Sequence, residues 1–155
     1  MYAGNELKSL IGKTDKDNQV IKLMADLGYT KPLKRPKRGE QDVNLVANEK
    51  GVELLFRLAE ALPERLGDQF QEGELVLYTI FFRPVADPTD AIYKDLPGDI
   101  QFATSRESLR ALWGAPEISS PKLPIDRWDS EGFKFHVRYK KDEKSIETLS
   151  VFPAD

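Results

Sequence analysis

Carboxylates gathered in one region are the first side chains whose types and spacing could do chemistry. This acidic set is Asp87, Asp90, Asp95 and Asp99. Oxygen ligands suit Ca²⁺ and Mg²⁺, but a calcium loop needs a tighter ligand spacing with a glycine at its turn, which does not occur here. We therefore interpret the region as a solvent-exposed acidic loop and predict no metal or cofactor, with metal binding as the alternative.

The single histidine is the other candidate for catalysis. His136 alternates with Lys134 and Arg138, which places it on the polar face of a predicted strand. A histidine acting as a general base needs a neighbouring carboxylate, and the spacing identifies none. The chain has no cysteine, which excludes thiolate zinc sites and a cysteine nucleophile. We predict that the protein is not an enzyme. A small enzyme or ligand-binding protein that uses His136 and a carboxylate in a pocket between helix and sheet is the alternative.

Charge is distributed unevenly along the sequence, although the totals nearly balance. The 23 basic and 26 acidic residues give a net charge of −3, which disfavours nucleic acid as the main ligand. The basic cluster 31–38 has no interleaved aromatic residue for base stacking, so we interpret it as a solvated loop. Acidic residues concentrate in 59–74 and include Glu72 and Glu74, which favours contact with a basic partner.

Two segments have the spacing of amphipathic helices and must position these groups. Residues 18–27 carry apolar side chains at helical intervals, with Asp17 as a candidate N-cap. Residues 105–113 repeat the pattern, with Ser105 as the cap and a glycine at the end. Residues 5–11 predict either a helical turn or a loop.

Five segments have the alternation or the β-branched and aromatic content of strands. They are residues 42–47, 52–58, 75–83, 133–139 and 146–152. A helix running to about Leu62 is the alternative for the second segment. Turn-forming residues precede the second and fourth segments, and Trp128 leads into the fourth, which predicts a hairpin or a three-stranded meander. Within 133–139, odd-numbered side chains are predicted to face the core and even-numbered ones solvent or a partner.

The order of these elements predicts an internal repeat. A helix ending in glycine, a proline-containing segment, a hairpin and a further strand occur in residues 5–83 and again in 93–152. Chance recurrence of common parts is the alternative. Two such units would bury both helices on a shared antiparallel sheet. We therefore predict a single α+β domain of 155 residues with two main helices on one side of its sheet.

The hydropathy pattern contains no long apolar segment. The N-terminal residues lack a continuous apolar stretch, and no segment approaches the roughly 18 apolar residues of a membrane span. These features predict a cytoplasmic protein that does not contact a membrane.

Two segments of the second half resemble a pattern found in bacterial immunity proteins. Residues 93–116 read YKDLPGDIQFATSRESLRALWGAP, and residues 126–152 read DRWDSEGFKFHVRYKKDEKSIETLSVF. The pattern is a Y-x-x-LP segment, a short strand, an SR helix ending LG-x-P and a final hairpin, with Trp113 in place of the usual aliphatic residue. The repeated helix-and-sheet unit is also similar to the β-lactamase inhibitor protein. Both resemblances imply a fold that binds another protein through a sheet face or loops, without turnover.

We therefore predict an immunity protein that binds a cognate bacterial toxin of the contact-dependent inhibition type and covers its active site. Acidic side chains would steer a basic, nuclease-like toxin domain toward it. The predicted contact residues are Asp87, Asp90, Asp95, Asp99, Glu72, Glu74 and His136. A structural adaptor built on the same repeat is a further alternative.

Overall fold

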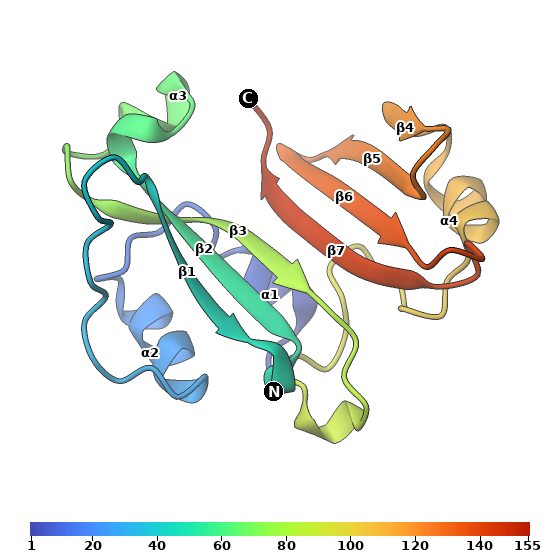
Figure 1. Cartoon of the computed structure of the whole chain (residues 1–155), viewed down its shortest axis with the longest axis horizontal. Helices are drawn as coiled ribbons and strands as arrows, with labels where there is room; N and C mark the ends of the chain where they lie inside the picture. Colours follow the sequence, from blue (N-terminus) through green and yellow to red (C-terminus); the bar gives the residue numbers. More distant parts are fainter.

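The computed structural model describes all residues from Met1 to Asp155 and contains one antiparallel sheet with helices packed on it (Figure 1). Its seven strands are β1 (Asp42–Ala47), β2 (Val52–Leu58), β3 (Leu75–Phe82), β4 (Ile118–Ser120), β5 (Ile125–Ser130), β6 (Phe133–Tyr139) and β7 (Ile146–Pro153). The α-helices are α1 (Gly4–Lys8), α2 (Asn18–Asp26), α3 (Glu64–Gly67) and α4 (Arg106–Trp113). Three short 3-10 turns are η1 (Asn48–Lys50), η2 (Ala59–Ala61) and η3 (Pro88–Asp90). The predicted α+β class is confirmed. None of these helices combines the length and the apolar composition that a membrane span requires.

The strand order places two three-stranded meanders side by side, and β4 adds a fourth strand at the outer edge of the second one. It runs β1-β2-β3-β7-β6-β5-β4, so β1 to β3 form one antiparallel meander and β5 to β7 form another. The two meanders join where β3 pairs with β7, from Ile80 opposite Val151 to Phe82 opposite Leu149. The predicted repeat requires an arrangement of this kind. That residues 5–83 and 93–152 superimpose stays a prediction.

The two hairpin turns both use glycine at a positive φ angle, yet they are built differently. Gly51 (φ 81) follows η1, whereas Gly132 (φ 84) follows Glu131 (φ 52) in a two-residue loop between β5 and β6. Two consecutive positive φ angles are typical of the type I′ turn, whose twist matches that of the strands. The helix alternative for β2 is wrong, because this segment pairs with β1 and β3 along its length.

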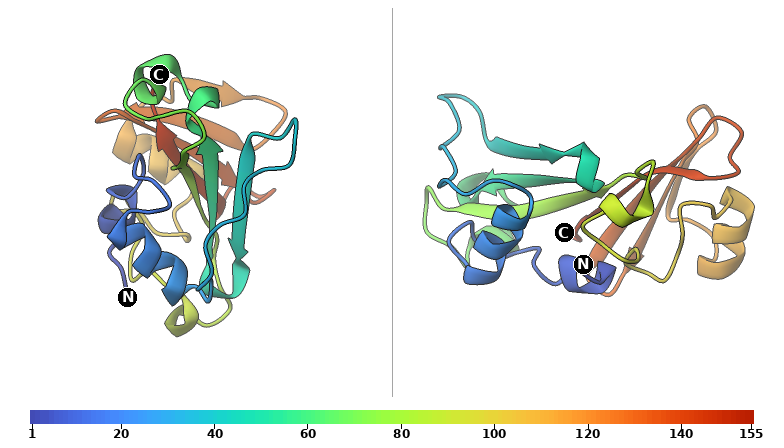
Figure 2. Two further views of the ribbon diagram at one scale, coloured as in Figure 1. Left: turned by 90° about the vertical axis from the view of Figure 1, so that its left-hand side faces the viewer. Right: turned by 90° about the horizontal axis from the view of Figure 1, so that it is seen from below.

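Three helices lie on the same side of the sheet, as Figure 2 shows for α1, α2 and α4. The Asp17 carboxylate accepts hydrogen bonds from two backbone amides in the first turn of α2. The Ser105 hydroxyl accepts one from the Ser108 amide at the start of α4. Both predicted N-caps are confirmed. Of the two alternatives for residues 5–11, a helical turn or a loop, the structure has the helix, which begins at Gly4 and ends at Lys8.

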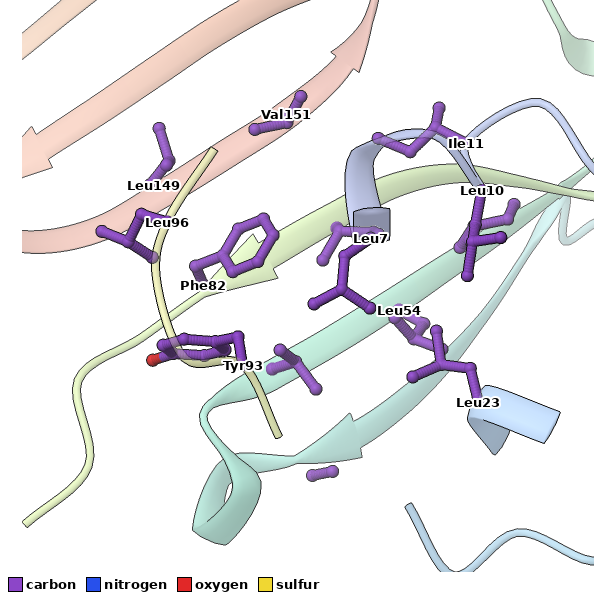
Figure 3. Close-up of a cluster of buried hydrophobic side chains, with 14 of the residues drawn as sticks. Leu7, Leu10, Ile11, Leu23, Leu54, Phe82, Tyr93, Leu96, Leu149 and Val151 are labelled. Carbon is purple, nitrogen blue, oxygen red and sulfur yellow. The ribbon is translucent and has the colours of Figure 1, made fainter. Parts of the chain in front are cut away.

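The main core fills the space between these helices and the sheet and runs across the seam between β3 and β7. Figure 3 shows Phe82 of β3 between Leu7 of α1 and Leu96, with Leu149 of β7 close by. The Tyr93 ring meets Phe82 edge to face, with 5.5 Å between ring centroids. Because side chains of both meanders contribute, one hydrophobic core serves both halves of the chain.

The predicted alternation of β6 is confirmed. Its fully or nearly fully buried residues are Phe135, Val137 and Tyr139. Phe133 is only half-buried, since it lies at the end of the strand beside the hairpin turn. Arg138 is exposed, whereas Lys134 and His136 are half-buried.

The opposite side of the sheet is covered only in part. η2 and α3 pack over Val76 and Tyr78 of the first meander, but no helix lies over the second meander in Figures 1 and 2. We call this uncovered side of β5 to β7, with the adjoining residue of β3, the open face. Its side chains are Ile125, Arg127, Asp129, Lys134, His136, Arg138, Thr148, Ser150 and Phe152, with Phe81 from β3.

Candidate interaction surface

The most concentrated polar cluster of the fold surrounds a buried carboxylate on β5. Asp126 is 0% exposed and accepts hydrogen bonds from Nη2 of Arg106 at 2.8 Å and Nη2 of Arg110 at 2.7 Å. The hydroxyls of Ser119 and Tyr139 donate to the same carboxylate at 2.8 and 3.1 Å. The two arginines are four residues apart on α4, so both reach the same strand. The carboxylate thereby fastens α4 to the sheet.

The electrostatics of this cluster identify it as structural. Burial opposes ionisation of Asp126, but hydrogen bonds from Arg110, Arg106, Ser119 and Tyr139 outweigh it and hold the pKa of the carboxyl well below its usual range. Burial, reinforced by the Asp126 charge, raises the pKa of the Tyr139 phenol. A carboxylate that stays ionised, fully paired and sealed from solvent is unsuited to exchange protons with a substrate.

The predicted acidic contacts do not form one surface. Asp87 and Asp90 lie at η3, after β3, whereas Glu72 and Glu74 lie before it. The eight residues of β3 separate the two pairs by about 25 Å. Glu74 is half-buried, while the other three are exposed. Hydrogen bonds from the amide and hydroxyl of Thr89 lower the pKa of the Asp87 carboxyl, which caps η3. The two pairs therefore cannot share one small contact region.

The remaining two acidic residues lie between η3 and α4. The Asp95 carboxylate accepts a hydrogen bond from the Gly4 amide at 2.6 Å, at the start of α1. A carboxylate is stabilising there because the helix N-terminus carries partial positive charge. Asp95 therefore has a structural role that the sequence prediction did not foresee. Asp99 is exposed and has a left-handed backbone conformation, with φ 56.

His136 is the one predicted contact that lies on the open face, and its neighbours are basic. Arg127 is directly opposite on β5, and Arg138 is two residues along on β6. Burial lowers the pKa of the His136 imidazole, and the charges of Arg127 and Arg138 lower it further. No carboxylate hydrogen-bonds His136, so the pair that the enzyme alternative requires is not formed.

Near the seam the open face becomes more apolar. Phe81 of β3 lies beside Ser150 of β7, and the Arg83 guanidinium lies 5.3 Å from the Phe81 ring centroid. The Phe152 ring lies 6.2 Å from that of Tyr78, between centroids. Half-buried aromatic rings beside planar cations are typical of protein–protein contact surfaces.

An aromatic corner lies on the helix side of the second meander, away from the open face. The Trp113 ring stands edge to face with Trp128 at 5.3 Å and with Phe135 at 5.5 Å. Together with Gly98 they line a cavity of about 170 Å³. The indole of Trp128 donates to the carbonyl of Gly114 at 3.1 Å, which satisfies its only polar group. We interpret the corner as packing between α4 and the sheet.

The cluster around Asp126 is absent from the site residues predicted from the sequence. The sequence does contain a signal for this cluster. Because side chains alternate along a strand, Asp126 lies on the same side of β5 as Trp128, and Arg127 lies on the other side. A charged residue at a core-facing position requires a partner. The identity of that partner on α4 depends on tertiary packing, which spacing alone does not give.

Comparisons with known proteins assign no family to this fold. No protein-family model and no curated protein matches the chain. Among solved structures, that of a DUF4309 family protein from Bacillus subtilis matches with a TM-score of 0.44 and 9% sequence identity, over 86% of this chain and 76% of that one. A likeness at this level carries no conclusion about function.

Proposed function

We propose that this chain is an immunity protein that neutralises a cognate bacterial toxin by binding it, and that the open face is the contact surface. The observation that carries the proposal is the open face itself. No helix lies over this sheet surface (Figure 2), and its strand register places half-buried aromatic and basic side chains opposite each other, such as Phe152 and Lys134.

The shape of this surface favours a protein partner. Sites for small molecules are concave and enclose most of the ligand. The cavities beside Gly98, Gln19, Glu64, Glu107 and Pro84 are all lined by residues other than Arg127, His136 and Arg138. A broad face with aromatic and arginine side chains instead suits a protein interface, where such residues supply most of the binding energy.

The proposed surface differs from the one that the sequence predicts. The acidic residues Asp87 and Glu72 lie at opposite ends of β3, and Asp95 holds α1. The open face retains His136 from the predicted contacts and adds residues of β5, β6 and β7. The acidic loops stay a prediction for long-range steering, which does not require direct contact.

Growth rescue tests the neutralising function. The product of the neighbouring reading frame is expressed in bacteria alone and together with this chain. We expect growth arrest in the first case and recovery in the second. Arrest that this chain does not relieve would contradict the immunity function, and a partner that is bound without being toxic alone would favour the structural adaptor.

A pair of matched substitutions tests the surface. Thr148→Trp places a bulky side chain on β7 in the open face, and Asp90→Trp places the same bulk on the exposed η3 turn. We expect the first variant to lose rescue and the second to keep it, with both showing wild-type circular dichroism. Full rescue by a folded Thr148→Trp variant would exclude the open face as the contact surface.

A further inference from the structure

Three basic side chains of the open face are immediate neighbours. Arg127 on β5 stands directly opposite His136 on β6, and Arg138 follows two residues later on the same face. The two guanidinium groups, Arg127 and Arg138, are diagonal neighbours across the strand pair, close enough for long side chains to interact. Their like charges repel each other, so the chain keeps this grouping at a cost to the stability of its sheet.

Other arginines on the same side of the sheet are neutralised within the chain. Arg57 forms an ion pair with Asp42 at 2.8 Å, and Arg83 forms one with Glu53 at 2.8 Å. In contrast, no ion pair involves the side chain of Arg127, Arg138 or His136. The Nε atom of Arg127 is buried and has no hydrogen-bond acceptor. A buried N–H group without an acceptor is costly, which points to an acceptor supplied from outside the chain.

Two acidic groups adjoin this array: Asp129 lies two residues from Arg127 on the same face and directly opposite Lys134, and the charges of Lys134 and Arg127 act on the Glu117 carboxyl. Glu117 and Asp129 lie toward the β4 edge, where hydrogen bonding with Asp129 raises the pKa of the Glu117 carboxyl. Glu147 is exposed on β7, beside the residue that pairs with Arg138. None of the three forms an ion pair with a basic side chain. Lys134 extends the array along β6, opposite Phe152 of β7. The basic side chains without an ion pair thus project from β5 and β6, in the second meander.

We propose that Arg127, His136 and Arg138 form a binding site for a carboxylate of an acidic segment on the partner protein. The inference rests on the proposed function, because it takes the open face as the contact surface. It gives the partner an acidic character at this face, whereas the sequence predicts a basic toxin. Guanidinium groups bind carboxylates through paired, charge-assisted hydrogen bonds, and a neutral or protonated imidazole supplies one more donor.

The size of the array favours a protein carboxylate over nucleic acid. His136 and Arg138 are two residues apart, which separates them by about 7 Å, enough for one or two anionic groups. A nucleic-acid backbone requires a longer run of cations. The neighbouring arginines of the first meander are already neutralised, and the net charge of the chain is −3.

The only histidine of the chain reports on this site directly, because its imidazole gives a single set of NMR signals. The free protein is titrated with a hexaglutamate peptide, a hexalysine peptide and a hexauridylate RNA. We expect hexaglutamate to shift the His136 signals saturably and to raise the pKa of His136, because a bound anion offsets the charges of Arg127 and Arg138. Hexalysine should leave the signals unchanged.

Matched variants localise the effect. Arg138→Gln and Arg127→Gln each remove one charge from the array, and Arg38→Gln removes one charge from the exposed basic loop. We expect about tenfold weaker hexaglutamate binding in the first two variants and no change in the third, since one charge-assisted bond contributes roughly that factor. Arg138 is exposed, so its substitution leaves the fold intact even where that of Arg127 does not.

Two kinds of result would overturn the proposed carboxylate site. Unshifted His136 signals with hexaglutamate, or equal binding by Arg138→Gln, would overturn the carboxylate site, and tighter binding of hexauridylate would replace it with a nucleic-acid site. No toxin takes part in this titration. Failed growth rescue with a normal titration would therefore reject only the proposed function, and the reverse pattern only the carboxylate site.

Discussion

Replacing the buried carboxylate of Asp126 with an amide should be among the most destabilising conservative substitutions in this chain. Asp126→Asn keeps the shape of the side chain but removes the charge that Arg106 and Arg110 share. The amide also presents N–H groups to donors that need an acceptor, so at least one hydrogen bond is lost and a like-charged arginine pair is left.

The magnitude follows from the exposure of the two partners. The Arg110 side chain is 41% exposed and can regain water, whereas that of Arg106 is only 12% exposed and keeps a single ion pair with Glu143 at 3.2 Å. Breaking a buried pair by removing one partner costs about 3–5 kcal/mol, and the solvent access of Arg110 places this case toward the lower end. We expect Asp126→Asn to lower the free energy of unfolding by about 3 kcal/mol at pH 7.

Urea denaturation followed by tryptophan fluorescence measures this loss, with Asp129→Asn as the control on the same strand. Asp129 is exposed and has no ion pair, so its substitution should change stability by less than about 0.5 kcal/mol. A difference below about 1 kcal/mol between Asp126→Asn and wild type at pH 7 would refute the assigned role of the carboxylate.

The pH dependence gives a second signature. The folded-state pKa of Asp126 lies below its unfolded value near 3.9, so the folded chain binds fewer protons at this group. The contribution of the Asp126 charge to the free energy of unfolding is complete above about pH 5 and is lost as the pH falls below about 3.9. The difference in the free energy of unfolding between wild type and Asp126→Asn should therefore become smaller in acid. A constant difference down to about pH 2 would contradict this electrostatic origin.

Three further predictions concern packing and titration. Phe135→Ala should cost about 3–5 kcal/mol because this ring is 4% exposed, while Lys134→Ala should leave the urea midpoint nearly unchanged; equal midpoints would mean that the faces of β6 are reversed. Gly4→Ala should lower the urea midpoint clearly, because an added Cβ would lie 2.3 Å from the backbone of Leu96, and an unchanged midpoint would reject this close packing. Proton NMR titration of His136 should give a pKa below 6.5, and a pKa above 6.5 would contradict the burial of the ring. Because the unfolded chain binds the proton more readily, the free energy of unfolding should fall as the pH drops from about 6.5 through the pKa of the folded chain.

Local patterns were sufficient for most elements of the fold. The caps at Asp17 and Ser105 and the alternation around Phe135 are short-range features that the chain carries in neighbouring residues. The sheet contains two meanders, and the predicted repeat of residues 5–83 in 93–152 stays a prediction. The pairing of β3 with β7 joins segments that are about half the chain apart, and no local pattern specified it.

The candidate site was less accessible from sequence, for two physical reasons. Clustering in sequence predicted clustering in space for the acidic residues, but the length of β3 separates Glu72 from Asp87. The basic array depends on cross-strand register, which places Arg127 opposite His136 although they are nine positions apart. Register is set by the turn and by the hydrophobic pattern of both strands together, so the alternation of β6 alone could not identify its neighbours.

The dissociation constant of the complex with the toxin, compared among wild type, Thr148→Trp and Asp87→Lys, tests most directly whether the open face binds the partner. We expect Thr148→Trp to weaken binding by at least about a hundredfold, because it blocks a central strand of that face, and Asp87→Lys to change the constant by less than about threefold. The reverse pattern, with strong weakening by Asp87→Lys and none by Thr148→Trp, would show that the acidic loops are the contact surface and that the open face is not.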